Sequence, residues 1–353
     1  MYWYYVINIF VLCSVALSFV NDERLRQSVQ AIYFPSVIFV LVLFVGFRSR
    51  SPDYDNYAVW FDWVSAGHLL AEDWAKDPAF VLISFIVSML GIGLVGVTLA
   101  FAIAALASQF VLSRIVSDRK WITLFFYLVV CRTLVGSDMA SIRSGVAIPL
   151  MSISIVFAFR GKRKIALLLY IVALAFHLSV LIGLVPFVLA MSKVRFTSRG
   201  WIVCVALVTV FIKAVLGNLL VLLSLFSRLT PYTGNLVESH APPSAYYVYI
   251  VARILLLALI AMFCWDALTA ENRMMLFCYS IGICLQIIFI FNNALSWRSS
   301  DIFGMFDIAV LMIPLKLMKG YYRLSYAVGL VAFGLALFQY SLNVMEPYRW
   351  IFA

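Results

Sequence analysis

Two apolar runs, separated by a short basic cluster, decide the fold of this chain. They read SIRSGVAIPLMSISIVFAF (residues 141–159) and IALLLYIVALAFHLSVLIGLVP (residues 165–186), and the cluster between them is RGKRK (residues 160–164). Each run carries one ionisable residue far from the cluster, Arg143 in the first and His177 in the second. If the cluster marks the cytoplasmic face of a membrane, both residues lie toward the opposite face. Ionisable groups at such depth are costly, so these two are candidates for function.

The composition excludes an ordinary soluble globular domain. Hydrophobic residues make up 65% of the chain and charged residues 12%, and the mean hydropathy is +1.04. Most segments between polar breaks approach the length of about 20 apolar residues that a spanning helix needs, and the alternating pattern of a transmembrane barrel is absent. We therefore predict an all-α polytopic membrane protein, in which residues 1–353 form a single integral membrane domain in contact with membrane lipids.

The charge and the cysteines argue against several other classes. A net charge of +10 in a membrane protein is typical of basic cytoplasmic loops that face anionic lipid, so we expect no nucleic-acid partner. All six cysteines lie in apolar runs, and none are paired at metal-ligand spacing. No phosphate-binding glycine loop is present. We expect neither a metal ion nor another cofactor.

Polar breaks divide the chain into about twelve transmembrane or half-length helices. Short polar stretches at residues 21–27, 136–141 and 292–301 are interpreted as loops or turns, and two longer ones, residues 48–78 and 228–245, as loops on the outer face. The expected crossings are residues 2–20, 31–47, 97–116, 121–135, 142–159, 201–225, 246–265, 274–291, 302–317 and 324–340.

Two segments do not fit a single straight crossing. Residues 79–90 could span or form a re-entrant or interfacial piece, and we expect the second, because it keeps the basic residues near 119 on the inner side. Residues 165–190 lie between two basic clusters that should both be cytoplasmic, which predicts a broken or re-entrant helix pair interrupted near Phe176 and His177. Non-helical backbone at membrane depth is tolerated where it lines protein or a wet cavity, so His177 is expected at the edge of such a cavity.

The loops assigned to the inner face support this orientation. They hold 16 of the 26 basic residues but only 5 of the 16 acids. The remaining arginines gather at the outer ends of spans, where lysine is nearly absent. Each could simply snorkel to lipid headgroups or pair with a nearby acid. As a group they indicate phosphate binding, because guanidinium is always charged and grips phosphate oxygens through a fixed fork. The group comprises Arg48, Arg50, Arg132, Arg143, Arg253 and Arg298.

The resemblance to a known family rests on four motifs in order. RSRSPDYDNY (residues 48–57) resembles the Arg…Asp-Tyr-x-x-Tyr signature of the EpsG family of Wzy-type O-antigen and exopolysaccharide polymerases. IRSGVAIPL (142–150) resembles its Arg-x-Gly/Ala-rich helix start, ALAFHLSVLIGLVP (173–186) its Phe-His segment, and SWRSSDIFGMF (296–306) its late arginine motif. Together they cover most of the chain.

The resemblance implies a GT-C-like, metal-independent glycosyltransferase of the bacterial inner membrane, active on the periplasmic side. Such enzymes transfer a growing glycan from undecaprenyl diphosphate to the non-reducing end of a lipid-linked repeat unit, so the same lipid-linked oligosaccharide is donor and acceptor. A chain-length regulator and a flippase are further partners that the family implies. The outer loops at 48–78 and 228–245 would then be periplasmic.

The candidate residues fit this chemistry. We expect His177 to act as the base on a sugar hydroxyl and Arg143 to act with it in catalysis. Arg48, Arg50, Arg132, Arg253 and Arg298 are expected to bind the diphosphate, and Asp53, Tyr54, Asp55 and Tyr57 to shape the sugar site. Two alternatives stay open: an O-antigen ligase-like glycosyltransferase, and a transporter or flippase for lipid-linked oligosaccharides, although no internal repeat is visible.

Overall fold

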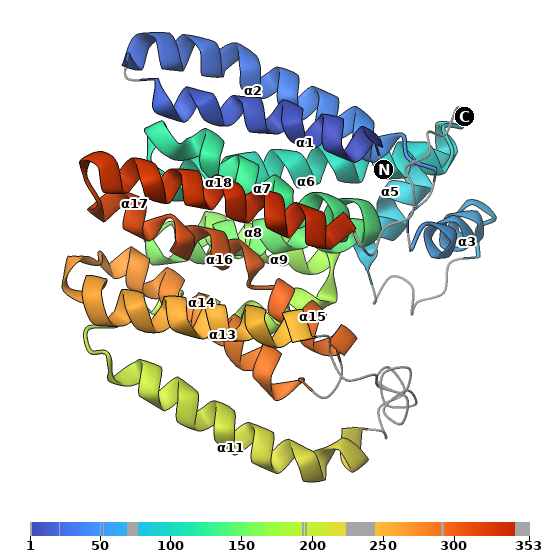
Figure 1. Ribbon diagram of the computed structural model, residues 1–353. Helices are drawn as coiled ribbons and strands as arrows, with labels where there is room; N and C mark the ends of the chain where they lie inside the picture. Colours follow the sequence, from blue (N-terminus) through green and yellow to red (C-terminus); the bar gives the residue numbers. More distant parts are fainter. Residues whose placement is uncertain are drawn as a thin grey trace. The chain divides into compact units, whose positions relative to one another are not determined.

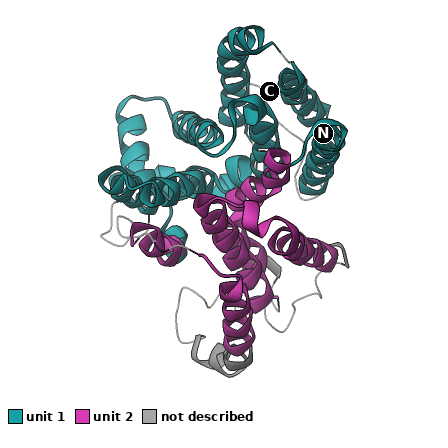
Figure 2. Cartoon of the chain, turned by 90° about the vertical axis from the view of Figure 1, so that its left-hand side faces the viewer, with its two compact units in different colours: residues 1–182, 318–353 teal, residues 183–317 magenta. Residues whose placement is uncertain are grey.

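A computed structural model describes residues 2–20, 22–49, 51, 53–68, 77–192, 194, 196–223, 244–290 and 293–342. These residues form helices joined by short loops, with no β-strand among them. They divide into two compact units, residues 1–182 with 318–353 and residues 183–317 (Figure 2).

The first unit is organised around α7 (Ile122–Thr133). Every residue of α7 except Arg132 is buried, which suits a helix that is apolar on all sides. It packs against α1, α6 and α18, and Figure 1 shows α18 lying along it. The remaining helices of the unit are α1 (Tyr2–Val15), α2 (Glu23–Gly46), α3 (Tyr54–Ser65), α5 (Pro78–Met89), α6 (Leu94–Val116), α8 (Ile142–Phe159), α9 (Arg163–Phe176) and α18 (Gly320–Leu342), with short 3₁₀ turns at Ala16–Phe19 and Arg119–Trp121.

Within the polar stretch at residues 21–27, a helix begins at Glu23, so the prediction of a loop was wrong there. The carboxylate of Asp22 accepts hydrogen bonds from the backbone N–H groups of Arg24 and Leu25, at 2.9 and 3.1 Å. An Asp at the N-cap satisfies donors that the helix itself leaves without partners, so α2 begins at Glu23, several residues before the apolar run.

The polar stretch at residues 48–78 contains the helix α3, which the polar composition of the stretch does not predict. Three side chains of α3 at helical spacing, Tyr57, Phe61 and Val64, are buried, and α3 packs against α5 and α6. The predicted turn at residues 136–141 is likewise helical, because Leu134–Ala140 forms one stretch of π-helix. The prediction of a turn at residues 136–141 was therefore wrong, whereas α3 lies within the stretch that is predicted as a loop on the outer face.

The α8–α9 pair is a tight antiparallel hairpin. Gly161 has a φ of +82°, which an L side chain rarely adopts, so it suits the turn between the two helices. Helix α9 ends at Phe176, where the sequence predicts an interruption, and His177 has extended backbone with φ −159°. A 3₁₀ stretch (Leu178–Gly183) follows.

The second unit holds α10 (Leu184–Met191), α11 (Gly200–Leu223), α13 (Ser244–Leu259), α14 (Ala270–Ile288), α15 (Asn293–Asp301), α16 (Gly304–Leu311) and α17 (Ile313–Leu317). A π-helical stretch at Ile260–Cys264 and a 3₁₀ turn at Trp265–Ala267 extend α13. Helix α15 occupies the segment predicted as a turn at residues 292–301, so that prediction was wrong. The predicted loop at residues 228–245 lies almost entirely outside the described residues.

Seven helices are long and apolar enough to cross a membrane, and three shorter apolar helices accompany them among the described residues. The prediction of a membrane-embedded, all-helical chain is confirmed at this level. The seven are Tyr2–Phe19, Glu23–Gly46, Leu94–Val116, Arg119–Ala140, Ile142–Phe159, Tyr246–Ala267 and Gly320–Leu342.

Candidate functional site

The α8–α9 hairpin brings Arg143 and His177 to the same end of the first unit. Arg143 is the second residue of α8, and His177 directly follows the last residue of α9. Counted from Gly161, they lie 18 and 16 residues away along antiparallel helices, or about 24–27 Å at a rise of 1.5 Å per residue. The basic cluster is therefore at one end of the hairpin, and both candidate residues are at the other.

Asp77 lies between these two side chains. Nη1 of Arg143 donates a hydrogen bond to Oδ2 of Asp77, and Nδ1 of His177 is 3.5 Å from Oδ1 of the same carboxylate. The carboxyl side chain is 3% exposed, whereas Arg143 and His177 are 22% and 27% exposed. The buried carboxylate thus contacts two partly accessible groups, a guanidinium of the kind that binds phosphate and an imidazole of the kind that transfers protons.

Two aromatic rings lie beside the guanidinium of Arg143. Its central carbon, Cζ, is 5.3 Å from the ring centre of Trp60 and 5.5 Å from the ring centre of Tyr57. Both distances are within the range of cation–π attraction. Trp60 in turn stacks on Phe80, with ring centres 4.4 Å apart. Both rings belong to the short helix α3, and the packing of α3 on α5 holds them in place. The rings therefore restrict where the guanidinium can lie.

An apolar cluster anchors the ends of the helices that carry the site. Phe80, in the first turn of α5, is fully buried and contacts Phe101 of α6, with ring centres 6.0 Å apart. Phe176, the residue before His177, packs edge-on against Phe101 at 5.4 Å. Asp77 and His177 are thus each close in sequence to an aromatic residue that packs on Phe101.

Burial raises the pKa of the Tyr57 phenol above its usual value of 10, although the nearby charge of Arg143 opposes the shift. The hydroxyl therefore stays protonated at neutral pH. Tyr54, on the same helix, shows the same direction: burial raises its pKa, and the charge of Arg48 opposes this.

The other predicted sugar-site residues lie at the start of α3. Oδ2 of Asp53 accepts a hydrogen bond of 3.3 Å from the hydroxyl of Ser141, which precedes α8. This contact ties the beginning of α3 to the helix end that carries Arg143. Asp55 is exposed, Tyr54 is half-buried and Tyr57 is buried. Of these four residues, Tyr57 is the one whose ring lies over the guanidinium of Arg143.

The remaining predicted arginines occupy different surroundings. Arg48 is fully buried, and its Nη1 donates to the carbonyl of Val45. Arg132 is half-buried at the end of α7, just before the π-helix. Arg298, in the second unit, is exposed on α15. Arg50 lies outside the described residues.

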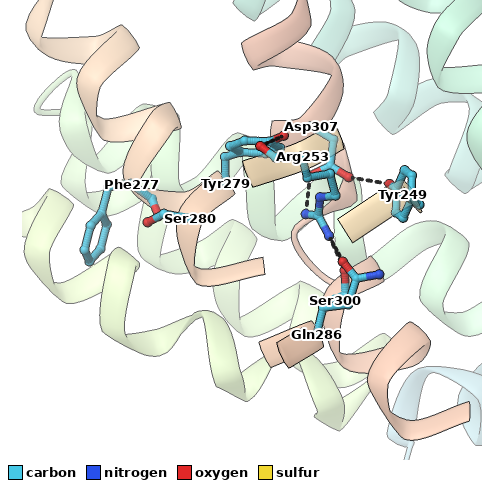
Figure 3. A network of polar contacts seen from close by, with 8 residues as sticks. All are labelled: Tyr249, Arg253, Phe277, Tyr279, Ser280, Gln286, Ser300 and Asp307. Carbon is cyan, nitrogen blue, oxygen red and sulfur yellow. Dashed lines mark hydrogen bonds and ion pairs between the residues drawn. The ribbon is translucent and has the colours of Figure 1, made fainter. Parts of the chain in front are cut away.

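Arg253 is held inside the second unit by a polar network (Figure 3). Its Nη2 is 2.7 Å from Oδ1 of Asp307, and its Nη1 donates to Oε1 of Gln286 at 2.6 Å and to the hydroxyl of Ser300 at 2.7 Å. The side chains of Arg253 and Asp307 are 4% and 7% exposed. A phosphate that reached these two nitrogens would compete with the partners that they already have.

Asp77 and Trp60 are residues of this site that were not predicted from the sequence. Asp77 is one of six acids in residues 48–78, and its position before Pro78 is a usable signal, since Asp is favoured at the N-cap and Pro at the first helical position. Trp60 follows Tyr57 by three residues, the spacing of side chains on one helix face, but this signal is readable only once α3 is known to be helical.

No cluster of three or more His, Cys, Asp or Glu side chains suited to a metal ion occurs in the part of the chain that the structure describes. The site described above instead offers a fixed cation, an imidazole and a carboxylate. Arginine can supply positive charge to an anionic leaving group, and histidine can accept a proton from a hydroxyl.

The fold and this site define the class: a polytopic helical membrane protein with an Arg–Asp–His cluster at the ends of its helices. Comparison with known families is more specific. The family model of the EpsG family matches residues 31–351, and the chain belongs to that family. The resemblance predicted from the four motifs is thereby confirmed. No curated protein and no solved structure matches the chain.

Proposed function

We propose that this chain is a polysaccharide polymerase. It transfers a growing glycan from undecaprenyl diphosphate to the non-reducing end of a lipid-linked repeat unit, at the periplasmic face of the bacterial inner membrane. Its fold in this proposal is a GT-C-like bundle of about twelve transmembrane or half-length helices. Membership of the EpsG family and the seven membrane-compatible helices support the general class.

The observation that carries the proposal is the meeting of Arg143 and His177 at one end of the α8–α9 hairpin. In the reaction, a hydroxyl oxygen of the acceptor sugar attacks the anomeric carbon of the donor. The new carbon–oxygen bond forms as the bond from that carbon to the phosphate oxygen breaks, and the diphosphate leaves with the bonding electrons. His177 accepts the hydroxyl proton, and Arg143 stabilises the negative charge of the diphosphate.

The other residues enter as proposals of the same kind. Arg48, Arg50, Arg132, Arg253 and Arg298 are candidates for holding the diphosphate. Arg298 is exposed, whereas Arg48 and Arg253 are buried, so a diphosphate could reach the last two only after their surroundings rearranged. Asp53, Tyr54, Asp55 and Tyr57 are proposed to shape the sugar site. Because arginines supply the positive charge, the reaction is proposed to run without a metal ion.

The test uses the purified full chain in detergent with a polyprenyl-diphosphate-linked repeat unit as its only substrate. The wild type is expected to lengthen the lipid-linked glycan. H177Q and R143Q are expected to lower the rate of glycan transfer at least about 100-fold, which is the usual rate loss when an acid–base or charge-stabilising group is removed. Matched controls are H68Q, an exposed residue that follows α3, and R160Q, at the opposite end of the hairpin. Both are expected to keep near wild-type rates.

Other outcomes separate the rival functions. Transfer of glycan to lipid A core without chain growth would indicate a ligase. Movement of the lipid across a vesicle membrane without any new glycosidic bond would indicate a transporter. Normal polymer from H177Q would contradict the role given to His177, even if the wild type is a polymerase.

A further inference from the structure

Asp77 has a carboxylate that the local backbone does not use. It occupies the N-cap position of α5, where an Asp side chain ordinarily accepts a hydrogen bond from the second or third backbone N–H of the helix. Here the side chain makes no such bond, and only its backbone carbonyl receives the N–H groups of Phe80 and Val81. The carboxylate of Asp77 is therefore directed elsewhere.

Each of its two oxygens faces a different partner. Oδ2 accepts from Arg143, and Oδ1 lies 3.5 Å from Nδ1 of His177. Both Oδ1 and this Nδ1 are buried, and neither has a hydrogen-bond partner among the residues that the structure describes. The separation is a few tenths of an ångström beyond a hydrogen bond, and such contacts in substrate-free sites commonly shorten when the substrate binds.

Accessibility separates the roles of the three residues. The side chain of Asp77 is 3% exposed, so it cannot touch a sugar or a phosphate, whereas His177 is 27% exposed. With Nδ1 turned toward the buried carboxylate, the other ring nitrogen, Nε2, is the one left for a ligand. A neutral imidazole carries one proton, and the nitrogen that donates to a carboxylate is the one that keeps it.

From these contacts we propose that Asp77 is a positioning residue, which holds His177 in the Nδ1–H tautomer so that Nε2 accepts the proton of the acceptor hydroxyl. This inference rests on the proposed function and deepens it. When the hydroxyl proton moves to Nε2, the proton on Nδ1 stays in place. The positive imidazolium then lies beside the carboxylate, and the electron pair of the broken anomeric bond leaves with the diphosphate beside Arg143.

The wild-type protein gives a direct test that needs no assay of activity. The chain contains three histidines, His68, His177 and His240, and ¹⁵N spectra of histidine-labelled full-length protein in nanodiscs distinguish protonated from unprotonated ring nitrogens. H177Q identifies the signals of His177 by their loss. We expect a protonated Nδ1 and an unprotonated Nε2 in the neutral ring. The opposite tautomer would overturn the proposal.

A second test uses the polymerisation rate. D77N is expected to lower kcat at least about 100-fold, and D77N combined with H177Q is expected to cost no more than H177Q alone, since residues that act as one unit show non-additive losses. D62N, which removes an exposed carboxylate from α3, serves as the matched control. Additive losses in the double variant, or wild-type kcat in D77N, would contradict the positioning role.

The two layers of the proposal fail separately. If the wild type makes no polymer from lipid-linked repeats, the proposed function fails, whatever the tautomer. If the wild type makes polymer while His177 carries its proton on Nε2, the function stands and the role of Asp77 fails. Where D77N does not yield folded protein, the wild-type spectra alone decide.

Discussion

The buried pair of Arg253 and Asp307 should show strong energetic coupling in a double-mutant cycle. R253M leaves a carboxylate that is 7% exposed without its cation, and D307L leaves a guanidinium that is 4% exposed without its anion. Removing one partner of a buried ion pair costs about 3–5 kcal/mol, because the other charge stays buried and uncompensated. Either single variant should therefore lose a large part of the stability of the second unit.

The double variant R253M/D307L removes both charges. Its main remaining cost comes from Gln286 and Ser300, which lose the hydrogen bonds that Arg253 donates, at about 1–3 kcal/mol for each buried polar group. The double variant should therefore lose about 2–6 kcal/mol, against about 6–10 kcal/mol for the sum of the two single losses. The middle values of these ranges give a coupling of about 4 kcal/mol.

The measurement is equilibrium unfolding of the full chain in mixed micelles, followed by helix circular dichroism and by tryptophan fluorescence. Coupling below about 0.5 kcal/mol would refute the reasoning, because it would mean that the two charges do not sense each other in the folded protein. The same variants also test whether Arg253 binds the ligand. A double variant that is stable but makes no polymer would indicate that Arg253 binds the substrate and does not only stabilise the fold.

Two further predictions concern the first unit. G145A should lower stability by about 1–3 kcal/mol in thermal unfolding, because overpacking strains a filled site. A Cβ at Gly145 would lie 2.7 Å from Oδ1 of Asp138 and 3.1 Å from the carbonyl oxygen of Ser137. G136A is the control, since a Cβ there would meet nothing within 4 Å, and equal losses in the two variants would contradict the prediction. The Tyr57 phenol should ionise only above pH 10, since burial raises its pKa. The contribution of Tyr57 to stability is then complete below pH 10 and declines above pH 10, because the phenol ionises first in the unfolded chain. Ultraviolet titration of the wild type against Y57F measures where Tyr57 ionises, and ionisation at or below pH 10 would contradict the prediction.

The helical membrane class and the candidate pair were accessible from sequence because both depend on local pattern. Apolar length predicts spanning helices, and the cluster at residues 160–164 marks a turn between two of them. An antiparallel hairpin then places Arg143 and His177 at a common end, whatever the rest of the fold. What the pattern could not supply is the third partner, because Asp77 reaches them only through the packing of α5 against α9.

The elements that sequence reasoning missed share one physical cause. Helix α3 carries two acids and lies in the most polar stretch of the chain, yet burial of Tyr57, Phe61 and Val64 against neighbouring helices stabilises it. The stretch at residues 136–141 has the composition of a turn, but Asp138 within it is buried and accepts hydrogen bonds from Gln109 at 2.7 Å and Thr133 at 3.0 Å. In both cases tertiary contacts outweigh the local preference of the residues.

The nearly equal arms of the α8–α9 hairpin limit how this chain can vary in length. An extra residue inside α8, between Arg143 and Gly161, would rotate the guanidinium by about 100° around the helix axis and shift it by about 1.5 Å, away from Asp77. Extra residues in the turn around Gly161 would leave both arms in register. Length differences between relatives should therefore collect at the basic turn, while the number of residues in each arm is kept.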